Sequence, residues 1–140
     1  MDTGRVLIAE FVEPGVARLV YRHFPVVAPL SALIAEASEC AVDQKRFWAF
    51  HDAAFARVAR RAMTGPGDIV AAARDARLDP AALETCRNAG ATRSRIEAEF
   101  REGVRRGVEG TPTLFINNKM IVGNQPADVF RSEINAARRR

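Results

Sequence analysis

The sequence of 140 residues has few lysines, two cysteines and no long apolar run. Only Lys45 and Lys119 are lysines, so 19 of the 21 basic residues are arginines. No stretch approaches the ~20 consecutive apolar residues that a membrane-spanning helix needs. The first residues also lack the basic segment, apolar segment and cleavage site of an export signal. The residues as written therefore predict neither a membrane span nor a membrane partner. They predict a cytoplasmic chain.

The composition that is present is typical of an ordinary globular domain. Hydrophobic residues make up 48% of the chain and charged residues 27%, both close to the average for soluble domains. A core of this size buries about two-thirds of the unfolded surface, so folding does not require a disulfide framework. The formal charge is +4, but 17 acidic residues are interleaved with the basic ones and no nucleic-acid motif occurs. We predict one domain over residues 1–140 without a nucleic-acid partner.

Two segments near the start have the composition of β-strands. Residues 6–11 form an apolar run with a single acid, Glu10, and residues 16–24 are rich in β-branched and aromatic types. Glu13, Pro14 and Gly15 lie between them. We therefore predict a strand in each segment.

From Ser31 onward the apolar residues recur at helical spacing. We predict helices that begin near Ser31, after Asp43, at Asp68, after Asp79 and at Thr92 or Ser94. Their predicted apolar faces include Leu33, Ile34, Ala37, Cys40 and Ala41, then Phe47, Phe50, Ala54, Phe55, Val58 and Ala62, and later Leu83 with Cys86. The last helix of this block is charged and carries Ile96, Phe100 and Val104. Glu36, Ser38 and Glu39 lie off the apolar face of the first of these helices.

A hairpin and a last helix follow the helical block. Residues 113–116 and 119–122 are two short apolar runs joined by Asn117 and Asn118. Asparagine tolerates the positive φ of a tight turn, so a two-residue hairpin is the simplest interpretation. Pro126 then begins a helix.

This order of elements resembles a thioredoxin fold with a helical insertion, and in particular the DsbA-like thiol-disulfide oxidoreductase family. The resemblance covers nearly the whole chain. Its segments are Val20-Tyr21-Arg22-His23-Phe24-Pro25, Ala35-Glu36-Ala37-Ser38-Glu39-Cys40-Ala41, Phe47-Trp48-Ala49-Phe50-His51-Asp52, Leu83-Glu84-Thr85-Cys86, Gly107-Val108-Glu109-Gly110-Thr111-Pro112-Thr113-Leu114-Phe115-Ile116-Asn117 and Val122-Gly123-Asn124-Gln125-Pro126. The resemblance implies an α/β fold with an all-helical insertion over about residues 29–107. It also implies that Pro112 is cis, in a loop that holds an extended substrate beside active cysteines.

The chain departs from this family at the active site. In the family, a strand similar to residues 6–11 is followed by a Cys-x-x-Cys at the start of a helix, and only then by the second strand. Here residues 12–15 alone separate the two predicted strands, so the dithiol and its helix are missing. Neither Cys40 nor Cys86 replaces them by position, and the thiolate that a helix N-terminus stabilises has no counterpart.

The missing helix has a topological consequence. A link of four residues joins antiparallel strands, whereas parallel strands need a crossover of about a dozen residues. We predict either an antiparallel hairpin of residues 6–11 with 16–22 or a homodimer that exchanges the first strand. An uncovered sheet face also favours a homo-oligomer.

The two cysteines have three possible states. On an apolar helix face, Cys40 and Cys86 can be free buried side chains. The resemblance adds a structural disulfide as the second state, and a redox-active pair is the third. His23 and His51 provide no close ligand pair with these cysteines, so we predict no metal and no cofactor. Glu10 resembles the buried acid beneath the family's cysteines, and without a dithiol we expect it at an edge or interface.

These observations lead to one expectation and two alternatives. We expect a DsbA-like protein without dithiol activity that binds a protein or peptide near Thr111 and Pro112. The bend at Pro112 is equally needed to enter the hairpin, so its role in binding stays open. The alternatives are a thiol-disulfide oxidoreductase that uses Cys40, Cys86 or a partner's cysteines, and a truncated or engineered relative without a function of its own.

Overall fold

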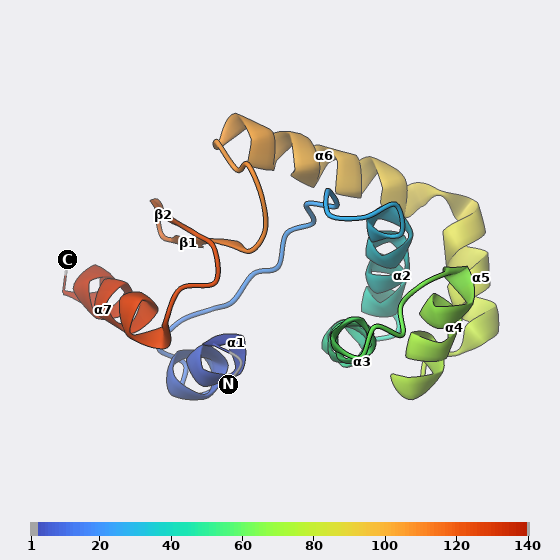
Figure 1. The fold of residues 1–140 in the computed structure, drawn as a ribbon, viewed down its shortest axis with the longest axis horizontal. Helices are drawn as coiled ribbons and strands as arrows, with labels where there is room; N and C mark the ends of the chain where they lie inside the picture. Colours follow the sequence, from blue (N-terminus) through green and yellow to red (C-terminus); the bar gives the residue numbers. More distant parts are fainter. Residues whose placement is uncertain (1–2, 140) are drawn as a thin grey trace. The chain divides into compact units, whose positions relative to one another are not determined.

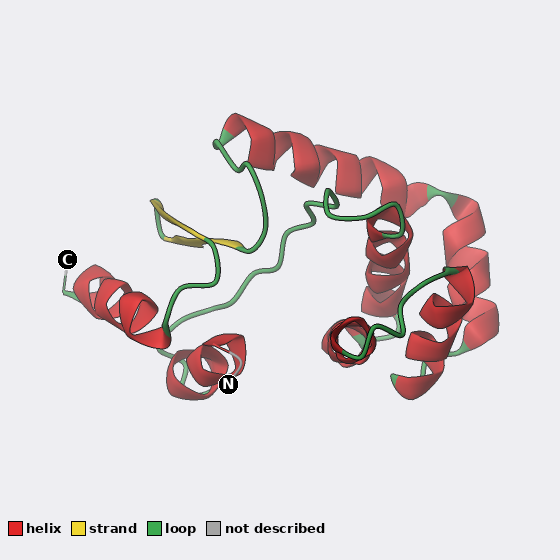
Figure 2. Ribbon diagram, in the orientation of Figure 1, coloured by secondary structure: helices red, strands yellow, loops and turns green. Residues whose placement is uncertain are grey.

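The computed structural model describes residues 3–139, which are mostly helical with one small antiparallel sheet. The elements follow one another along the chain as shown in Figures 1 and 2: α1 (Thr3–Leu7), the π-helical turn η1 (Ile8–Val12), α2 (Ser31–Asp43), α3 (Phe47–Ala59), α4 (Pro66–Asp75), α5 (Pro80–Ala89), α6 (Ala91–Arg105), β1 (Thr113–Ile116), β2 (Lys119–Val122) and α7 (Ala127–Arg138). They form two compact units. One contains His23–Arg105, and the other contains the chain up to Arg22 and from Arg106 onward.

Helix α2 is the centre of the helical unit. It contacts α3, α4, α5 and α6, and every residue from Ala35 to Ala41 is buried. Small side chains on α2 allow the surrounding helices to approach closely, and Phe50, Ile69 and Leu83 fill the core around them. The periodicity of the sequence therefore placed Ala37, Cys40 and Ala41 of α2 in the core correctly.

The caps of the helical unit follow from local chemistry. The Asp79 side chain accepts hydrogen bonds from the amides of Ala81 and Ala82 at 2.8 and 3.0 Å, which confirms the predicted cap before Pro80. Asp68 does not begin α4 as expected, because the helix starts at Pro66. Its carboxylate instead accepts hydrogen bonds from Thr64 and Gly65, which lower its pKa.

Two predicted burial patterns in this unit are wrong. Phe55 and Val58 of α3 are 57% and 51% exposed, although they were expected in the core. Glu36 and Glu39 of α2, expected at the surface, are each only 8% exposed. The reason is tertiary: α2 is surrounded by helices, whereas α3 packs through Phe50 and Ala54 and leaves another face in solvent.

The second unit contains the hairpin and the helices that pack near it. Strands β1 and β2 pair antiparallel, with Ile116 opposite Lys119 next to the turn, as predicted. Asn117 provides the positive φ, at 52°. Helix α7 contacts both β1 and α1. Phe11 of η1, Ile121 of β2 and Phe130 of α7 are buried side chains of this unit.

The predicted strands at residues 6–11 and 16–24 are not formed. Residues 6–7 belong to α1 and residues 8–11 to η1, while residues 17–24 have no regular secondary structure. The predicted hairpin of residues 6–11 with 16–22 is therefore wrong, and residues 6–11 offer no strand for exchange. A short apolar run does not distinguish a strand from a helix by its periodicity, and here the packing of α1 against α7 favours the helix.

No helix in the part of the chain that the structure describes is both long and apolar enough to cross a membrane.

Candidate functional site

The loop before β1 contains the predicted binding residues. Thr111 and Pro112 are exposed, and the peptide bond between them is cis. The Pro112 carbonyl accepts a hydrogen bond from the Gly123 amide at 2.8 Å, and the Thr113 hydroxyl donates one to the Gly110 carbonyl at 2.7 Å. Both bonds lie at the open end of the hairpin, where Thr113 is opposite Val122. Thr111 and Pro112 are thus presented to solvent on an ordered support.

Strand β1 has one edge that β2 does not use. In a two-residue hairpin the residues next to the turn, here Ile116 and Lys119, exchange hydrogen bonds, and the pattern alternates along the strand. The amide and carbonyl groups of Thr113 and Phe115 therefore point away from β2. Within residues 3–139 no other strand pairs with this edge. This edge of β1 can therefore pair with one more extended chain.

The cysteines lie in the helical unit, where α2 and α5 contribute one each. Cys40 and Cys86 form a disulfide with a sequence separation of 46 residues. Cys40 is only 1% exposed, and Cys86 is half-buried against the core. Thiol-disulfide exchange requires a thiolate to reach one of the sulfur atoms, so burial of Cys40 restricts attack to Cys86. This placement suits a cross-link between two helices.

A buried ionic cluster joins α2 to α6 in the same unit. Nε2 of His23 lies 3.0 Å from a carboxylate oxygen of Glu39, and the Arg95 guanidinium donates to the other oxygen at 2.6 Å. His23 is 3% exposed, and its backbone amide donates to Glu99 at 2.7 Å. A buried carboxylate needs such partners to offset its desolvation. The cluster fixes the chain before α2 and the start of α6 against the same helix.

Sequence reasoning missed this cluster and the neighbouring pair, in which Arg93 donates to Glu36 at 2.9 Å. Glu36 and Glu39 are three residues apart, which places them on one side of a helix. That spacing is a usable signal of a shared partner. Arg93 and Arg95 are only two residues apart, however, so nothing in the sequence selected them from 19 arginines.

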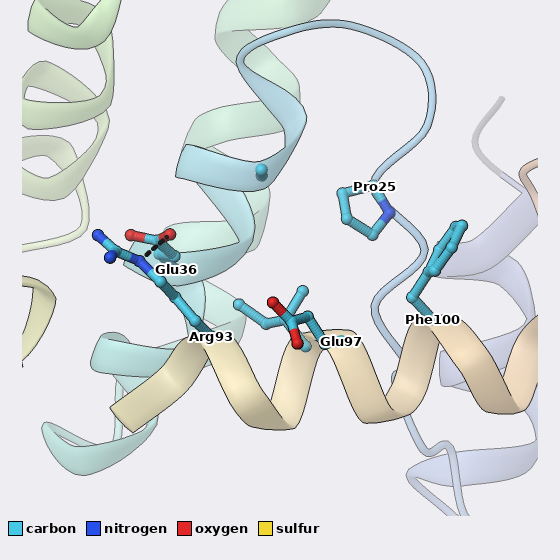
Figure 3. Close-up of a pocket in the computed structure, with 7 residues that line it drawn as sticks. Pro25, Glu36, Arg93, Glu97 and Phe100 are labelled. Carbon is cyan, nitrogen blue, oxygen red and sulfur yellow. Dashed lines mark hydrogen bonds and ion pairs between the residues drawn. The ribbon is translucent and has the colours of Figure 1, made fainter. Parts of the chain in front are cut away.

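An open cavity of about 260 Å³ lies beside the Glu36–Arg93 pair. Its walls come from the loop before α2, from α2 and from α6, as Figure 3 shows: Pro25, Ala32, Glu36, Arg93, Ile96, Glu97 and Phe100. Four of these residues are apolar, and Glu36, Arg93 and Glu97 are charged. The cavity can therefore bind an apolar group beside charged side chains, and no cysteine, histidine, serine or threonine is among these lining residues.

The two histidines, considered above as metal ligands together with the cysteines, have different partners. Nδ1 of His51 lies 3.0 Å from Asp52 on α3, while His23 contacts Glu39. Among residues 3–139 no three histidine, cysteine, aspartate or glutamate side chains come together as a metal-binding group. The structure therefore gathers no ligand set from the residues that the sequence offered.

Glu10 pairs with Arg131 of α7 in the second unit. The Arg131 guanidinium donates to both carboxylate oxygens at 2.6 Å, and it also donates to Asp128 at 2.6 Å. The hydrogen bonds from Arg131 hold the pKa of Glu10 below its ordinary value of 4.5, and they raise the pKa of Arg131. Glu10 thus links η1 to α7 at the surface.

Comparison with known proteins identifies similar sequences. A family model described as DSBA-like thioredoxin domain matches residues 27–135. A Na(+)/H(+) antiporter, NhaA 1 of Salinispora arenicola, is 30% identical over 138 residues, which cover 95% of this chain and 20% of that protein. NhaA 3 of Salinispora tropica is 34% identical over 125 residues, covering 86% of this chain and 18% of that protein. The chain spans about a fifth of the length of these curated relatives. No solved structure matches the chain.

Proposed function

The chain belongs to the family of DSBA-like thioredoxin domains, and on that premise we propose that it binds an extended protein segment along β1 without dithiol catalysis. The observation that carries this proposal is the outer edge of β1, where Thr113 and Phe115 present backbone groups beyond the hairpin. An added peptide strand would pair with these groups. Thr111 and Pro112, both exposed at the start of the same edge, would contact its side chains.

The fold class agrees with the proposed binding mode. The chain has a thioredoxin-like α/β fold in which a helical block precedes a small antiparallel sheet. Strand addition takes affinity from main-chain hydrogen bonds and specificity from alternate side chains. The partly buried side chains of β1, Leu114 and Phe115 among them, would give such a strand an apolar neighbour.

The absence of a Cys-x-x-Cys supports the second half of the proposal. The chain has two cysteines, 46 residues apart, and both are joined in the cross-link between α2 and α5. A catalytic dithiol needs an accessible sulfur whose thiolate is stabilised by its surroundings. Cys40 is buried among apolar residues, which is the environment of an inert cysteine.

Removal of one outward-facing amide tests the binding edge. Thr113→Pro deletes that donor at a position where an edge strand tolerates proline, whereas Thr113→Ala removes the side chain and keeps the amide. We expect Thr113→Pro to weaken binding of a fluorescein-labelled, reduced and alkylated insulin B chain about fivefold, the value of one hydrogen bond. Fluorescence anisotropy measures this affinity. Equal affinities of the proline and alanine variants would show that the peptide does not pair with the β1 edge.

Oxidoreductase activity is the alternative function, and the half-buried position of Cys86 is the observation that favours it. Insulin reduction in the presence of dithiothreitol separates the two functions. We expect insulin reduction to be no faster with the full chain and dithiothreitol than with dithiothreitol alone. Turnover that disappears in Cys86→Ser would instead support the oxidoreductase.

The relatives suggest a class of partner for the binding edge. Since they are named Na(+)/H(+) antiporters, we propose that the bound segment belongs to a protein of that kind. Co-purification of the full chain with a tagged antiporter tests this proposal, with Thr113→Pro expected to reduce recovery relative to Thr113→Ala. Equal recovery of both variants would argue against contact through β1.

A further inference from the structure

Helix α3 carries large apolar side chains on two faces. Phe50 and Ala54 face the core and are 0% and 3% exposed. Trp48, Phe55 and Val58 lie on another face, with exposed fractions of 44%, 57% and 51%. Rings follow one another along this face, because the His51 ring lies 5.4 Å from Trp48 and 4.6 Å from Phe55. We call Trp48, Phe55 and Val58 the outer stripe of α3.

Basic residues lie on both sides of this stripe in the sequence. Residues 45–61 contain five basic residues against one acidic residue, a net charge of +4, which equals the net charge of the whole chain. Arg57 forms an ion pair with Asp75 of α4. The other four, Lys45, Arg46, Arg60 and Arg61, form no ion pair with any residue from 3 to 139. Two of them precede α3 and two follow it, so basic pairs flank the stripe at both ends.

The acid in this segment lies next to the stripe and has a local partner. Asp52 is 59% exposed, and its carboxylate lies 3.0 Å from Nδ1 of His51. Since Arg57 is paired with Asp75, Asp52 is one negative charge beside the four remaining basic residues, so the field around α3 remains positive. The surface therefore combines aromatic and aliphatic side chains with a cationic border.

From this combination we propose that α3 is a docking surface for an anionic lipid bilayer. Tryptophan, phenylalanine and valine on one face, with basic residues beside them, are the features of helices that lie in a membrane interface. A single helix face is convex, whereas a peptide partner is usually held in a groove between elements. Charge complementarity then selects anionic over neutral lipid. This surface lies in the helical unit and does not depend on the proposed binding edge of β1.

Intrinsic fluorescence provides a direct test, because Trp48 is the single tryptophan of the chain. We expect its emission to shift to the blue when vesicles of phosphatidylserine and phosphatidylcholine are added to the full chain. Vesicles of phosphatidylcholine alone should leave the emission unchanged, and added salt should reverse the shift, since it screens the attraction. Co-sedimentation with the same vesicles measures affinity independently.

Exposed residues provide matched variants. We expect Phe55→Ser to lower affinity for the anionic vesicles about tenfold, through loss of buried apolar area. Arg60→Gln should lower it about fivefold, through loss of one charge near the lipid surface. Val58→Ser should also weaken binding, whereas Val104→Ser, at an equally exposed valine of α6, and Arg101→Gln on the same helix should not.

Three outcomes would overturn the proposal. The first is an unchanged Trp48 emission together with no co-sedimentation with anionic vesicles. The second is an equal loss of affinity in Val104→Ser and Val58→Ser, which would remove α3 from the binding surface. The third is binding of polyglutamate without any response to vesicles, which would indicate an acidic protein partner instead.

Discussion

Single residues show which local rules operate in this chain and where packing adds to them. Asp79 caps α5 through its own sequence neighbours, so its role can be predicted without knowledge of the fold. Glu10 differs, because its partner Arg131 lies 121 positions away. The missing dithiol led us to expect Glu10 at an edge or interface, and the structure gives it two surface hydrogen bonds from Arg131 of α7.

The Glu10–Arg131 pair predicts a pH-dependent contribution to stability. Arg131 lowers the pKa of Glu10, so the pair stabilises the folded chain above the ordinary pKa of 4.5 and loses this effect as the pH falls through the lowered value. We expect Glu10→Gln to lower the free energy of unfolding at neutral pH and to match the unsubstituted protein at strongly acidic pH. Urea denaturation across the pH range measures both limits.

Glu13→Gln is the matched control for this prediction, since it removes the same charge from an exposed glutamate three residues away. Its effect should be smaller at neutral pH. Identical unfolding free energies of the two variants at every pH would show that the hydrogen bonds from Arg131 contribute nothing.

At the scale of elements, helices were easier to predict than strands. The helices from α2 to α7 follow apolar periodicity, caps and proline positions, whereas α1 and η1 come from a segment with strand-like composition. Each helix of the helical unit also depends on its neighbours: α2 buries two glutamates because α6 supplies Arg93 and Arg95. Helix α5 is in addition joined to α2 covalently through Cys86.

The link between α2 and α5 predicts a loss of stability on reduction. A disulfide that closes a loop of 46 residues restricts the unfolded chain by about 4 kcal/mol in the chain-entropy account. We expect dithiothreitol to lower the free energy of unfolding by up to that amount, measured by circular dichroism in urea. The double variant Cys40→Ala, Cys86→Ala should not respond to dithiothreitol. Equal stability of the oxidised and reduced protein would contradict a structural role for the disulfide.

The whole chain is divided into a larger helical unit and a smaller unit built from both ends of the sequence. The smaller unit buries Phe11, Ile121 and Phe130 but leaves many large apolar side chains in solvent. These exposed residues are Val16, Leu19, Val20, Tyr21, Met120, Val122 and Val129. Apolar side chains that are exposed in one chain can be buried between two chains.

We predict that this surface forms a homodimer, as expected from the sequence. Light scattering should give a mass twice that of one chain, and Val122→Lys should shift the population toward monomer. Val27→Lys is the matched control, because Val27 is 76% exposed in the helical unit. A monomer at every concentration would contradict the prediction.

The sequence by itself determined the family, the helical block, the hairpin and the Asp79 cap, because these depend on motifs and on contacts between near neighbours. Only the tertiary structure decided the conformation of residues 6–11, since a short apolar run takes the form that its packing partner stabilises. It also decided the burial of Glu39, its pairing with His23 and Arg95, and the exposure of Phe55. Burial and pairing arise when folding brings elements together. The apolar periodicity of a helix does not show how many of its faces other elements will cover.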